Sequence, residues 1–290
     1  MFPGFARQCI PTRDTDIHLR LGGSGPPVLL IHGYPQTHVA WHKVVPHLAE
    51  SFTVVVPDLR GYGDSAAPEP DPHRVAYSKR AMAQDLVEVM TALGFDHFGL
   101  AGHDRGGRVA YRLALDHPTR VRRLAVCDMV PTLDEAERTD WRLAWSTYHW
   151  FFLAQPAPLP ETLIGQVPDF YVQHTLHSWV GKPEAIAPEA MAEYVRCFRR
   201  PTVIRATCED YPAGLSVDLA HDRADREAGT RLRRPVLAIS GTQSQSADLV
   251  EMWRRWADEV QGLPLNAGHF VMEEAPKEVA LALAQFFPEA

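Results

Sequence analysis

The sequence predicts an α/β fold, in which helices cover both faces of a mostly parallel sheet and a helical insertion interrupts the series of strands. In the first 130 residues, short apolar runs alternate with longer amphipathic stretches, as in βα units. From residue 131 to about 230 strand-like runs become scarce, and strand character returns near residue 234. We therefore predict a core domain formed by residues 1–130 and 231–290 and a cap domain formed by residues 131–230.

Each expected strand is a continuous apolar run, which is typical of strands covered on both faces. The runs are PPVLLIHG (26–33), FTVVVPD (52–58), HFGLAGHD (97–104), VRRLAVCD (121–128), RPVLAISG (234–241) and VQGLPLNAGHF (260–270, with its exit loop). Helical patterns occupy 78–93, 104–117 and 247–259. Because ligands bind at the carboxyl ends of the strands in such sheets, we expect the insertion to cover that edge as a lid.

Composition and charge exclude several classes of function. The net charge of −7 gives no reason to expect nucleic acid as a partner. No run approaches the roughly 18 apolar residues of a membrane span, and the first residues lack the apolar core of a signal peptide. The four cysteines are scattered, which favours reduced thiols. We expect a cytoplasmic protein with neither nucleic acid nor a membrane as partner.

Histidine spacing gives little indication of a metal site. His38 and His42 are four residues apart, and His174 and His177 are three apart. Neither pair has an acidic residue or a cysteine nearby as an obvious third ligand. We expect no metal and no cofactor.

The segment GHDRG (102–106) places Asp104 between a strand and a helix, with glycine two residues away on each side. In this context the G-x-nucleophile-x-G pattern is informative, because the sharp turn holds the side chain at the helix N-terminus. The free N–H groups and the helix dipole favour negative charge there. A helix N-cap is the structural alternative for Asp104, and the motifs that follow it in the chain favour the nucleophile.

With HGYP (32–35), the GHDRG turn, an insertion after the sixth strand and GHF (268–270), the chain resembles the α/β-hydrolase superfamily along nearly its whole length. The resemblance implies an eight-stranded, mostly parallel sheet with a helical cap after strand six, and the chain order nucleophile, acid, histidine. His269 matches the late histidine. The backbone N–H groups of Tyr34 and Arg105 match the oxyanion hole.

The acid has two candidates. Asp248, in the segment after the seventh strand, comes late and falls inside an expected helix. Asp128 follows the run VRRLAVC at the carboxyl end of a strand and is the better candidate. Its role would be to hold His269 in one tautomer and to stabilise the imidazolium. A strand-end cap is the structural alternative for Asp128.

An aspartate nucleophile indicates a different reaction from that of a serine. A carboxylate is a poor partner for acyl transfer but displaces a leaving group at saturated carbon and forms an ester. His269 would then activate water against the ester carbonyl of Asp104. Each oxyanion-hole donor contributes roughly 3 kcal/mol to that second step. We therefore predict a hydrolase that works by displacement.

Two arginines follow the predicted nucleophile. Arg105 stands where dehalogenases and epoxide hydrolases with an Asp nucleophile usually have Trp, and Arg108 lies on the same helix face. Two guanidinium groups beside a carboxylate are favourable if the substrate itself carries a carboxylate. An exposed Arg105 and a surface salt bridge at Arg108 are the alternatives, and for Arg108 taken alone the two interpretations are equally supported.

A halide site would have to come from the cap. STYHWFFLAQPAP (146–158) contains His149 and Trp150, and CEDYPAG (208–214) contains Tyr211. Each of these side chains can donate one hydrogen bond to a departing halide. Packing inside the cap explains the aromatic residues equally well on spacing alone.

Five segments together resemble the fluoroacetate (haloacetate) dehalogenase family over most of the chain: HGYPQTHVAWH, DLRGYGDS, GHDRGGR, YHWFFLAQPAPLPE and CEDYPAG. The resemblance implies hydrolysis of fluoroacetate or chloroacetate to glycolate and halide, without a cofactor, by a homodimer. The residue roles that it implies are Asp104 as nucleophile, His269 as base, Asp128 as acid, Arg105 and Arg108 as substrate-carboxylate clamp, His149, Trp150 and Tyr211 as halide donors, and His103 and Trp179 as pocket residues.

Two other functions compete with this one. An epoxide hydrolase would use HGYP equally well, with Tyr148 and Tyr211 as proton donors to the epoxide oxygen, although a neutral epoxide has no use for Arg105. A non-catalytic protein that binds a small acid is the second rival. The complete set of Asp104, Asp128 and His269 argues against it.

Overall fold

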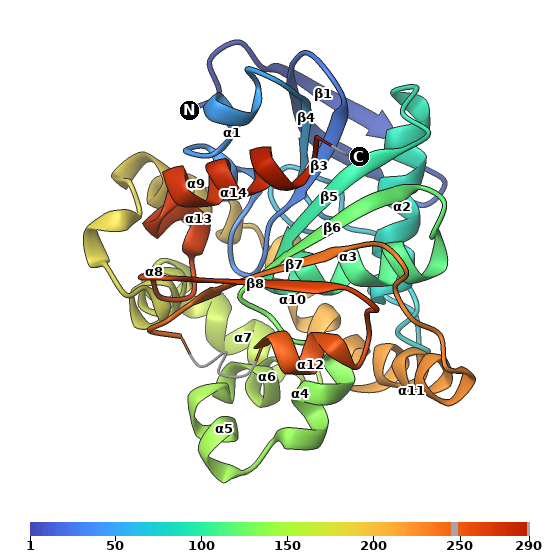
Figure 1. The fold of residues 1–290 in the computed structure, drawn as a ribbon. Helices are drawn as coiled ribbons and strands as arrows, with labels where there is room; N and C mark the ends of the chain where they lie inside the picture. The colour runs from blue at the N-terminus through green and yellow to red at the C-terminus, as the bar shows by residue number, and fades with distance from the viewer. Residues whose placement is uncertain (245–248, 289–290) are drawn as a thin grey trace.

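The computed structural model describes residues 1–244 and 249–288 (Figure 1). Eight strands form one sheet in the order β1-β2-β4-β3-β5-β6-β7-β8. The strands are β1 (Ala6–Pro11), β2 (Asp16–Gly23), β3 (Pro27–Ile31), β4 (Thr53–Pro57), β5 (Phe98–His103), β6 (Val121–Cys127), β7 (Val236–Gly241) and β8 (Val260–Leu265). β2 runs antiparallel to both β1 and β4, and the other neighbours pair in parallel. The predicted eight-stranded, mostly parallel sheet is confirmed.

The six predicted apolar runs each contain one strand, and successive side chains on these strands enter two different cores. On β3, Leu29 and Ile31 face one core, while Val28 and Leu30 face the other. The first core lies under α2 (Lys79–Ala92) and α3 (Asp104–Asp116), and the second under α1 (Val45–Leu48) and α14 (Pro276–Phe286). Figure 1 shows these two pairs of helices on opposite faces of the sheet. Burial on both faces explains why the runs are continuously apolar.

The hairpin of β1 and β2 was not singled out from the sequence. β1 reads ARQCIP and alternates between exposed and partly buried residues, because it is the edge strand and only one of its faces is covered. It therefore lacks the continuous apolar run that marks the central strands. The helix expected over 247–259 begins at residues outside the described ranges, and α12 (Leu249–Arg254) ends early where Ala257 pairs with Leu232.

A long helical segment separates β6 from β7, and no strand lies in it. Its elements are α4 (Thr132–Arg138), α5 (Trp141–Ser146), α6 (Tyr148–Leu153), α7 (Leu159–Gln166), α8 (Pro168–Trp179), η2 (Pro183–Ala185), α9 (Pro188–Phe198), α10 (Pro201–Ala213), η3 (Gly214–Asp218) and α11 (Leu219–Ala228). Figure 1 shows α4 to α7 together beyond one end of the sheet. The predicted domain boundaries fall in the connections from β6 to α4 and from α11 to β7. None of the described helices is both long and apolar enough to cross a bilayer.

A buried glutamate lies where the core meets the cap. Glu273, on α13 (Val271–Glu274), accepts hydrogen bonds through Oε1 from the Tyr194 hydroxyl of α9 (2.5 Å) and from Gln36 Nε2 (3.2 Å). Lys43 Nζ lies 3.8 Å from its Oε2. Burial raises the pKa of Glu273 to about 7, because the bond from Tyr194 and the charge of Lys43 only partly offset the loss of hydration, and the charge of Glu274 adds to the rise.

This raised pKa predicts a pH-dependent stability. Since the folded protein binds the Glu273 proton more tightly than the unfolded chain does, the contribution is fully present below the unfolded pKa and is lost as the pH rises to about 7. Glu273→Gln cannot titrate, so its free energy of unfolding relative to wild type should rise by about 2–3 kcal/mol from pH 5 to pH 8. Urea denaturation at both pH values measures this, and a difference that does not change with pH contradicts the prediction.

Candidate active site

Asp104 lies at a strained turn between β5 and α3. Its φ of +46° falls in the left-handed region, which is uncommon for a residue other than glycine and marks functional turns. The turn is possible because Gly106 has no side chain, since a Cβ there would lie 2.1 Å from the carbonyl oxygen of His32. The turn therefore presents Asp104, which is 8% exposed, at the first position of α3. This is the geometry that GHDRG predicts.

Three predicted residues from separate segments converge here. His269, in the loop after β8, has Nδ1 2.7 Å from Asp128 Oδ2 and Nε2 3.9 Å from Asp104 Oδ2. Asp128 follows β6 with a φ of +47°, and its Oδ1 accepts hydrogen bonds from the Gly241 amide (3.0 Å) and the Ser244 hydroxyl (2.6 Å). The structure thus places Asp128 against the histidine, whereas Asp248 lies outside the described residues. Ser244 supports the acid and was not identified from the sequence.

The charge of the histidine is stabilised by its two neighbours. Burial by itself lowers the pKa of His269, but the hydrogen bond and charge of Asp128, together with the charge of Asp104, outweigh this and raise the pKa. Asp128 and Asp104 therefore favour the imidazolium form of His269, which is the form that a general base acquires when it takes a proton.

One oxygen of Asp104 already contacts a predicted oxyanion donor. The Tyr34 amide donates to Asp104 Oδ1 at 2.9 Å, and the other oxygen, Oδ2, faces His269. The amide of Arg105 lies in the first turn of α3, where helix N–H groups have no partner within the helix. The two carboxylate oxygens thus have different surroundings, one against a backbone donor and one toward the histidine.

Arg105 is fully buried and paired with a carboxylate, which contradicts the alternative of an exposed Arg105. Its Nε and Nη2 contact Asp210 Oδ2 (3.0 Å) and Oδ1 (2.6 Å), and Nη2 also donates to the Asp210 carbonyl (2.8 Å). The guanidinium carbon lies 4.3 Å from the ring centroid of Tyr211 and 5.1 Å from that of Trp150. Nη1 alone lacks a hydrogen-bond partner. Most of the Arg105 guanidinium is therefore committed to Asp210, and only Nη1 remains without a hydrogen-bond partner.

Asp210, on α10 of the cap, also binds core residues. It accepts a hydrogen bond from the Tyr62 hydroxyl (2.7 Å) and forms an ion pair with Lys79. The Nζ of Lys79 also lies 3.6 Å from Asp218 Oδ2. Burial raises the pKa of Asp210, but Arg105 and Lys79 outweigh it and hold the pKa well below its usual range. Two cations and two carboxylates thus balance in one buried cluster. No sequence signal pointed to it, because its members come from separate segments.

Arg108 lies in the cavity without an ion-pair partner among the described residues, although the charge of Glu135 acts on it. Its Nη1 donates to Thr132 Oγ1 (3.1 Å), and its guanidinium carbon lies 4.5 Å from the ring centroid of Trp150. In residues 1–244 and 249–288 it forms no ion pair with a carboxylate, although it is only 4% exposed. The salt bridge that was the alternative for Arg108 is therefore not seen within those ranges. This guanidinium is suited to an anionic ligand.

The three predicted halide donors lie together. The ring centroid of Tyr211 is 5.7 Å from those of His149 and Trp150. Burial lowers the pKa of His149 to about 3, so the ring is neutral at pH 7 and has one N–H. His149 Nδ1 and the Tyr211 hydroxyl are both buried without a hydrogen-bond partner. Unsatisfied buried polar atoms are rare, and a bound ligand is one explanation for them.

A cavity of about 180 Å³ joins these groups. Residues that line it include Asp104, Arg108, Asp128, His149, Trp150, Trp179 and His269. The cap also contributes Glu135, Arg138, Leu143, Ser146 and Thr147 to the lining. Trp179 is in the wall, as predicted, with its ring centroid 4.4 Å from that of His149. Arg105 and Tyr211 lie behind the lining.

His103 does not line the cavity, which corrects its assignment as a pocket residue. It is fully buried, and its Nε2 lies 2.9 Å from the main-chain carbonyl of His269. Burial, together with the charge of His269, holds the pKa of His103 well below its usual range. His103 is the last residue of β5, and its side chain contacts the backbone of the loop after β8 that contains His269.

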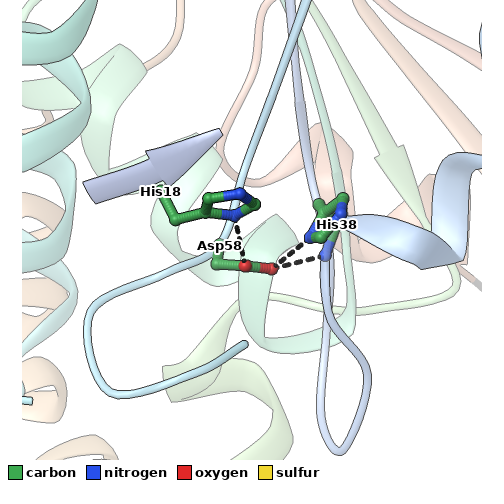
Figure 2. A group of neighbouring side chains, drawn as sticks. All are labelled: His18, His38 and Asp58. Atoms are coloured by element: carbon green, nitrogen blue, oxygen red, sulfur yellow. Dashed lines mark hydrogen bonds and ion pairs between the residues drawn. The ribbon is translucent and has the colours of Figure 1, made fainter. Parts of the chain in front are cut away.

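A second cluster, away from Asp104, has the residue types of a metal site (Figure 2). His18, His38 and Asp58 have ligand atoms within 4.8 Å of one another. Asp58 Oδ1 is bonded to the amide (2.7 Å) and Nδ1 (2.9 Å) of His38, and Oδ2 to His18 Nδ1 (2.9 Å) and the Asp64 amide (2.8 Å). These four partners use the acceptor capacity of the carboxylate. Hydrogen bonding therefore explains the cluster as a link between β2, η1 (His38–Trp41) and the loop after β4, and the absence of a metal stays a prediction.

The fold and this site define an α/β hydrolase. The chain belongs to the alpha/beta hydrolase fold family, whose model matches residues 26–276. It is 42% identical to a fluoroacetate dehalogenase of Burkholderia sp, over all of this chain and 96% of that protein, which confirms the resemblance noted in the motifs. It is 36% identical to a soluble epoxide hydrolase of Corynebacterium sp. (strain C12), over 93% of each chain. A solved Nostoc sp PCC 7120 protein assigned to the alpha/beta hydrolases is 50% identical over 99% of each chain, with a TM-score of 0.96.

The buried Arg105–Asp210 pair predicts a large loss of stability when one partner is removed. Asp210→Asn leaves Arg105 and Lys79 facing one carboxylate, and an uncompensated buried charge costs about 3–5 kcal/mol. Urea denaturation measures the change. The matched control is Asp169→Asn, which breaks the exposed pair with Arg199 and should cost below about 1 kcal/mol. Similar losses in the two variants would show that the buried pair adds little.

Proposed function

We propose that this protein hydrolyses the carbon–halogen bond of a small 2-halocarboxylate, fluoroacetate or chloroacetate, and releases glycolate and halide. The observation that carries the proposal is the uncommitted guanidinium of Arg108 in the cavity beside Asp104. A neutral substrate has no use for a buried cation there, whereas a carboxylate forms charge-assisted hydrogen bonds with it. The free Nη1 of Arg105 adds a second donor.

In the first step, Asp104 Oδ2 attacks the carbon that carries the halogen. A carbon–oxygen bond forms, the electron pair of the carbon–halogen bond leaves with the halide, and no proton moves. His149, Trp150 and the Tyr211 hydroxyl donate hydrogen bonds to the halide. The neutral His149 and the unpartnered Tyr211 hydroxyl support this role, because a halide leaving water needs replacement donors.

In the second step, His269 Nε2 takes a proton from water, and the water oxygen attacks Cγ of the Asp104 ester. The negative charge develops on the oxygen held by the Tyr34 amide, with the Arg105 amide as second donor. Collapse breaks the bond from Cγ to the glycolate oxygen, which receives the proton from His269, and the new Asp104 carboxyl group loses the second water proton to solvent, so one H⁺ leaves for each halide. Asp128 stabilises the imidazolium between these transfers. Because displacement occurs once at carbon, a chiral substrate is inverted.

Epoxide hydrolysis is the second candidate function. The unpartnered Tyr211 hydroxyl favours it, since the same group can donate to an epoxide oxygen, and the 36% identical relative is a soluble epoxide hydrolase. Tyr148, the other predicted proton donor, is 46% exposed, which supports that role less well. Asp104, Asp128 and His269 serve both reactions in the same way, so the substrate cation site decides between them.

Halide release tests the proposal directly. Wild type should release chloride from chloroacetate and fluoride from fluoroacetate, and Asp104→Asn should lower the rate at least about 1000-fold because the nucleophile is lost. A chloride assay and a fluoride electrode measure the two ions. Chloride without fluoride would remove fluoroacetate from the proposal. Epoxide turnover without halide release would favour the second candidate, and binding without turnover of either would indicate a non-catalytic protein.

A charge-selective comparison tests Arg108. Arg108→Met should lower kcat/KM for chloroacetate roughly 100-fold, because a charge-assisted hydrogen bond contributes about 1.5–3 kcal/mol. The uncharged chloroacetamide has the same size, and its turnover should change little. Arg199→Met, on the exposed surface of the cap, is the matched control and should leave both substrates unaffected. An equal loss for the two substrates would show that Arg108 does not recognise the carboxylate.

We also propose that two copies of the chain form a homodimer through the cap. Large apolar side chains are exposed on α5 to α8, among them Trp145 (82% exposed), Trp141 (70%) and Phe170 (66%). A concentration of such residues is unusual on a monomer and marks interaction sites. Light scattering should give twice the mass of the chain, and Trp145→Glu should shift the protein toward monomer at micromolar concentration. A monomeric wild type contradicts the proposal.

A further inference from the structure

We propose that Glu274 is a positioning residue for His269 and that it fixes the histidine loop to the cap segment that forms the cavity wall. The inference rests on the proposed function, in which His269 acts as the base of the second step. Glu274 follows Glu273 on α13, but the two side chains have different partners, since that of Glu273 binds Tyr194 and Gln36.

The Glu274 carboxylate binds the backbone on both sides of His269. Oε2 accepts a hydrogen bond from the Gly268 amide (2.9 Å), and Oε1 accepts one from the Phe270 amide (3.1 Å). Oε2 also accepts from the amides of Gly181 (2.9 Å) and Lys182 (3.1 Å), in the cap segment after α8. One carboxylate thus satisfies four backbone N–H groups, which matches its acceptor capacity.

The cap segment and the histidine loop also contact each other directly. The His269 amide donates to the carbonyl of Trp179 at 3.0 Å. A Cβ on Gly268 would lie 2.3 Å from the Gly181 nitrogen, so the two backbones touch at a distance that only glycine allows. Trp179, whose side chain lines the cavity, and His269 are therefore held by the same set of contacts.

The two chemical steps depend on this support to different degrees. Displacement of the halide uses Asp104, whereas hydrolysis of the ester requires Nε2 of His269 beside the attacking water. A displacement of about 1 Å in a catalytic group can slow a reaction on the order of 100-fold. Loss of Glu274 should therefore slow the second step more than the first, and the Asp104 ester should accumulate.

Glu274→Gln is the test variant. The amide keeps the size of the side chain, but its NH₂ group is a donor that faces backbone N–H donors, so hydrogen bonds on one side are lost. After mixing with chloroacetate we expect a burst of about one chloride per site, then a steady-state rate about 100-fold below that of wild type. Mass spectrometry of quenched protein should show the ester on Asp104. His269→Gln is the reference for the trapped ester.

Glu273→Gln is the matched control, because it makes the same change one residue away on the same helix. Glu273 is also buried, and its carboxylate binds Tyr194 and Gln36. Within residues 1–244 and 249–288 this carboxylate forms no hydrogen bond with the histidine loop, which Glu273 contacts only through its backbone amide. It should show neither the burst nor the ester. An equal slowing of both steps in Glu274→Gln, or the same accumulation in Glu273→Gln, overturns the inference.

Amide hydrogen exchange separates this inference from the proposed function. In Glu274→Gln, peptides that contain residues 266–271 and 179–183 should exchange faster together, while both remain protected in Glu273→Gln. This result is expected whatever the substrate. If wild type releases no halide but the exchange result holds, the proposed function fails and the positioning role stands. Unchanged exchange in both peptides overturns the positioning role.

Discussion

An ionised carboxylate that leaves water must be compensated by donors and cations, and this requirement governs the surroundings of Asp104. The side chain is 8% exposed, at a strained turn that aims it into the cavity. A backbone amide contacts one of its oxygens, the histidine faces the other, and two buried guanidinium groups follow on α3. The same compensation would stabilise the charge of a carboxylate substrate. Nucleophile and ligand site are thus parts of one electrostatic arrangement.

The two guanidinium groups meet this requirement in different ways. Arg105 is balanced by Asp210, and the balance extends through Lys79 to Asp218, so the buried cluster carries as many positive as negative groups. Arg108 has no carboxylate partner among the described residues and lines the cavity. Pairing makes Arg105 a fixed link between cap and core behind the cavity lining. The absence of pairing leaves Arg108 to interact with what enters the cavity.

The cap participates in the site as well as covering it. It contributes His149, Trp150 and Tyr211 above Asp104, and the pair of Arg105 with Asp210 joins α10 to the core. At a second junction, Glu274 binds the segment after α8 and the loop of His269. Because each junction consists of several hydrogen bonds between cap and core, a shift of the cap relative to the core would disturb the nucleophile's neighbours and the base together.

By itself, the sequence determined the features that depend on local pattern. Continuous apolar runs identified the central strands because both of their faces are buried, and Gly102 to Gly106 identified the turn at Asp104. Asp128 was found because it follows a strand at the carboxyl edge of a parallel sheet, and His269 because GHF resembles the late histidine segment of the α/β-hydrolase superfamily. The edge hairpin of β1 and β2 lacks that pattern and was not singled out.

Only the tertiary structure decided which charges are paired. Arg105 and Asp210 are 105 positions apart, and Glu274 binds a cap segment more than 90 positions away, so no spacing in the chain predicts either contact. His103 belongs to the informative segment GHDRG, yet only packing decides that it supports the histidine loop from behind. A residue's type and place in a motif give its chemistry, but its partners follow from packing between elements far apart in the chain.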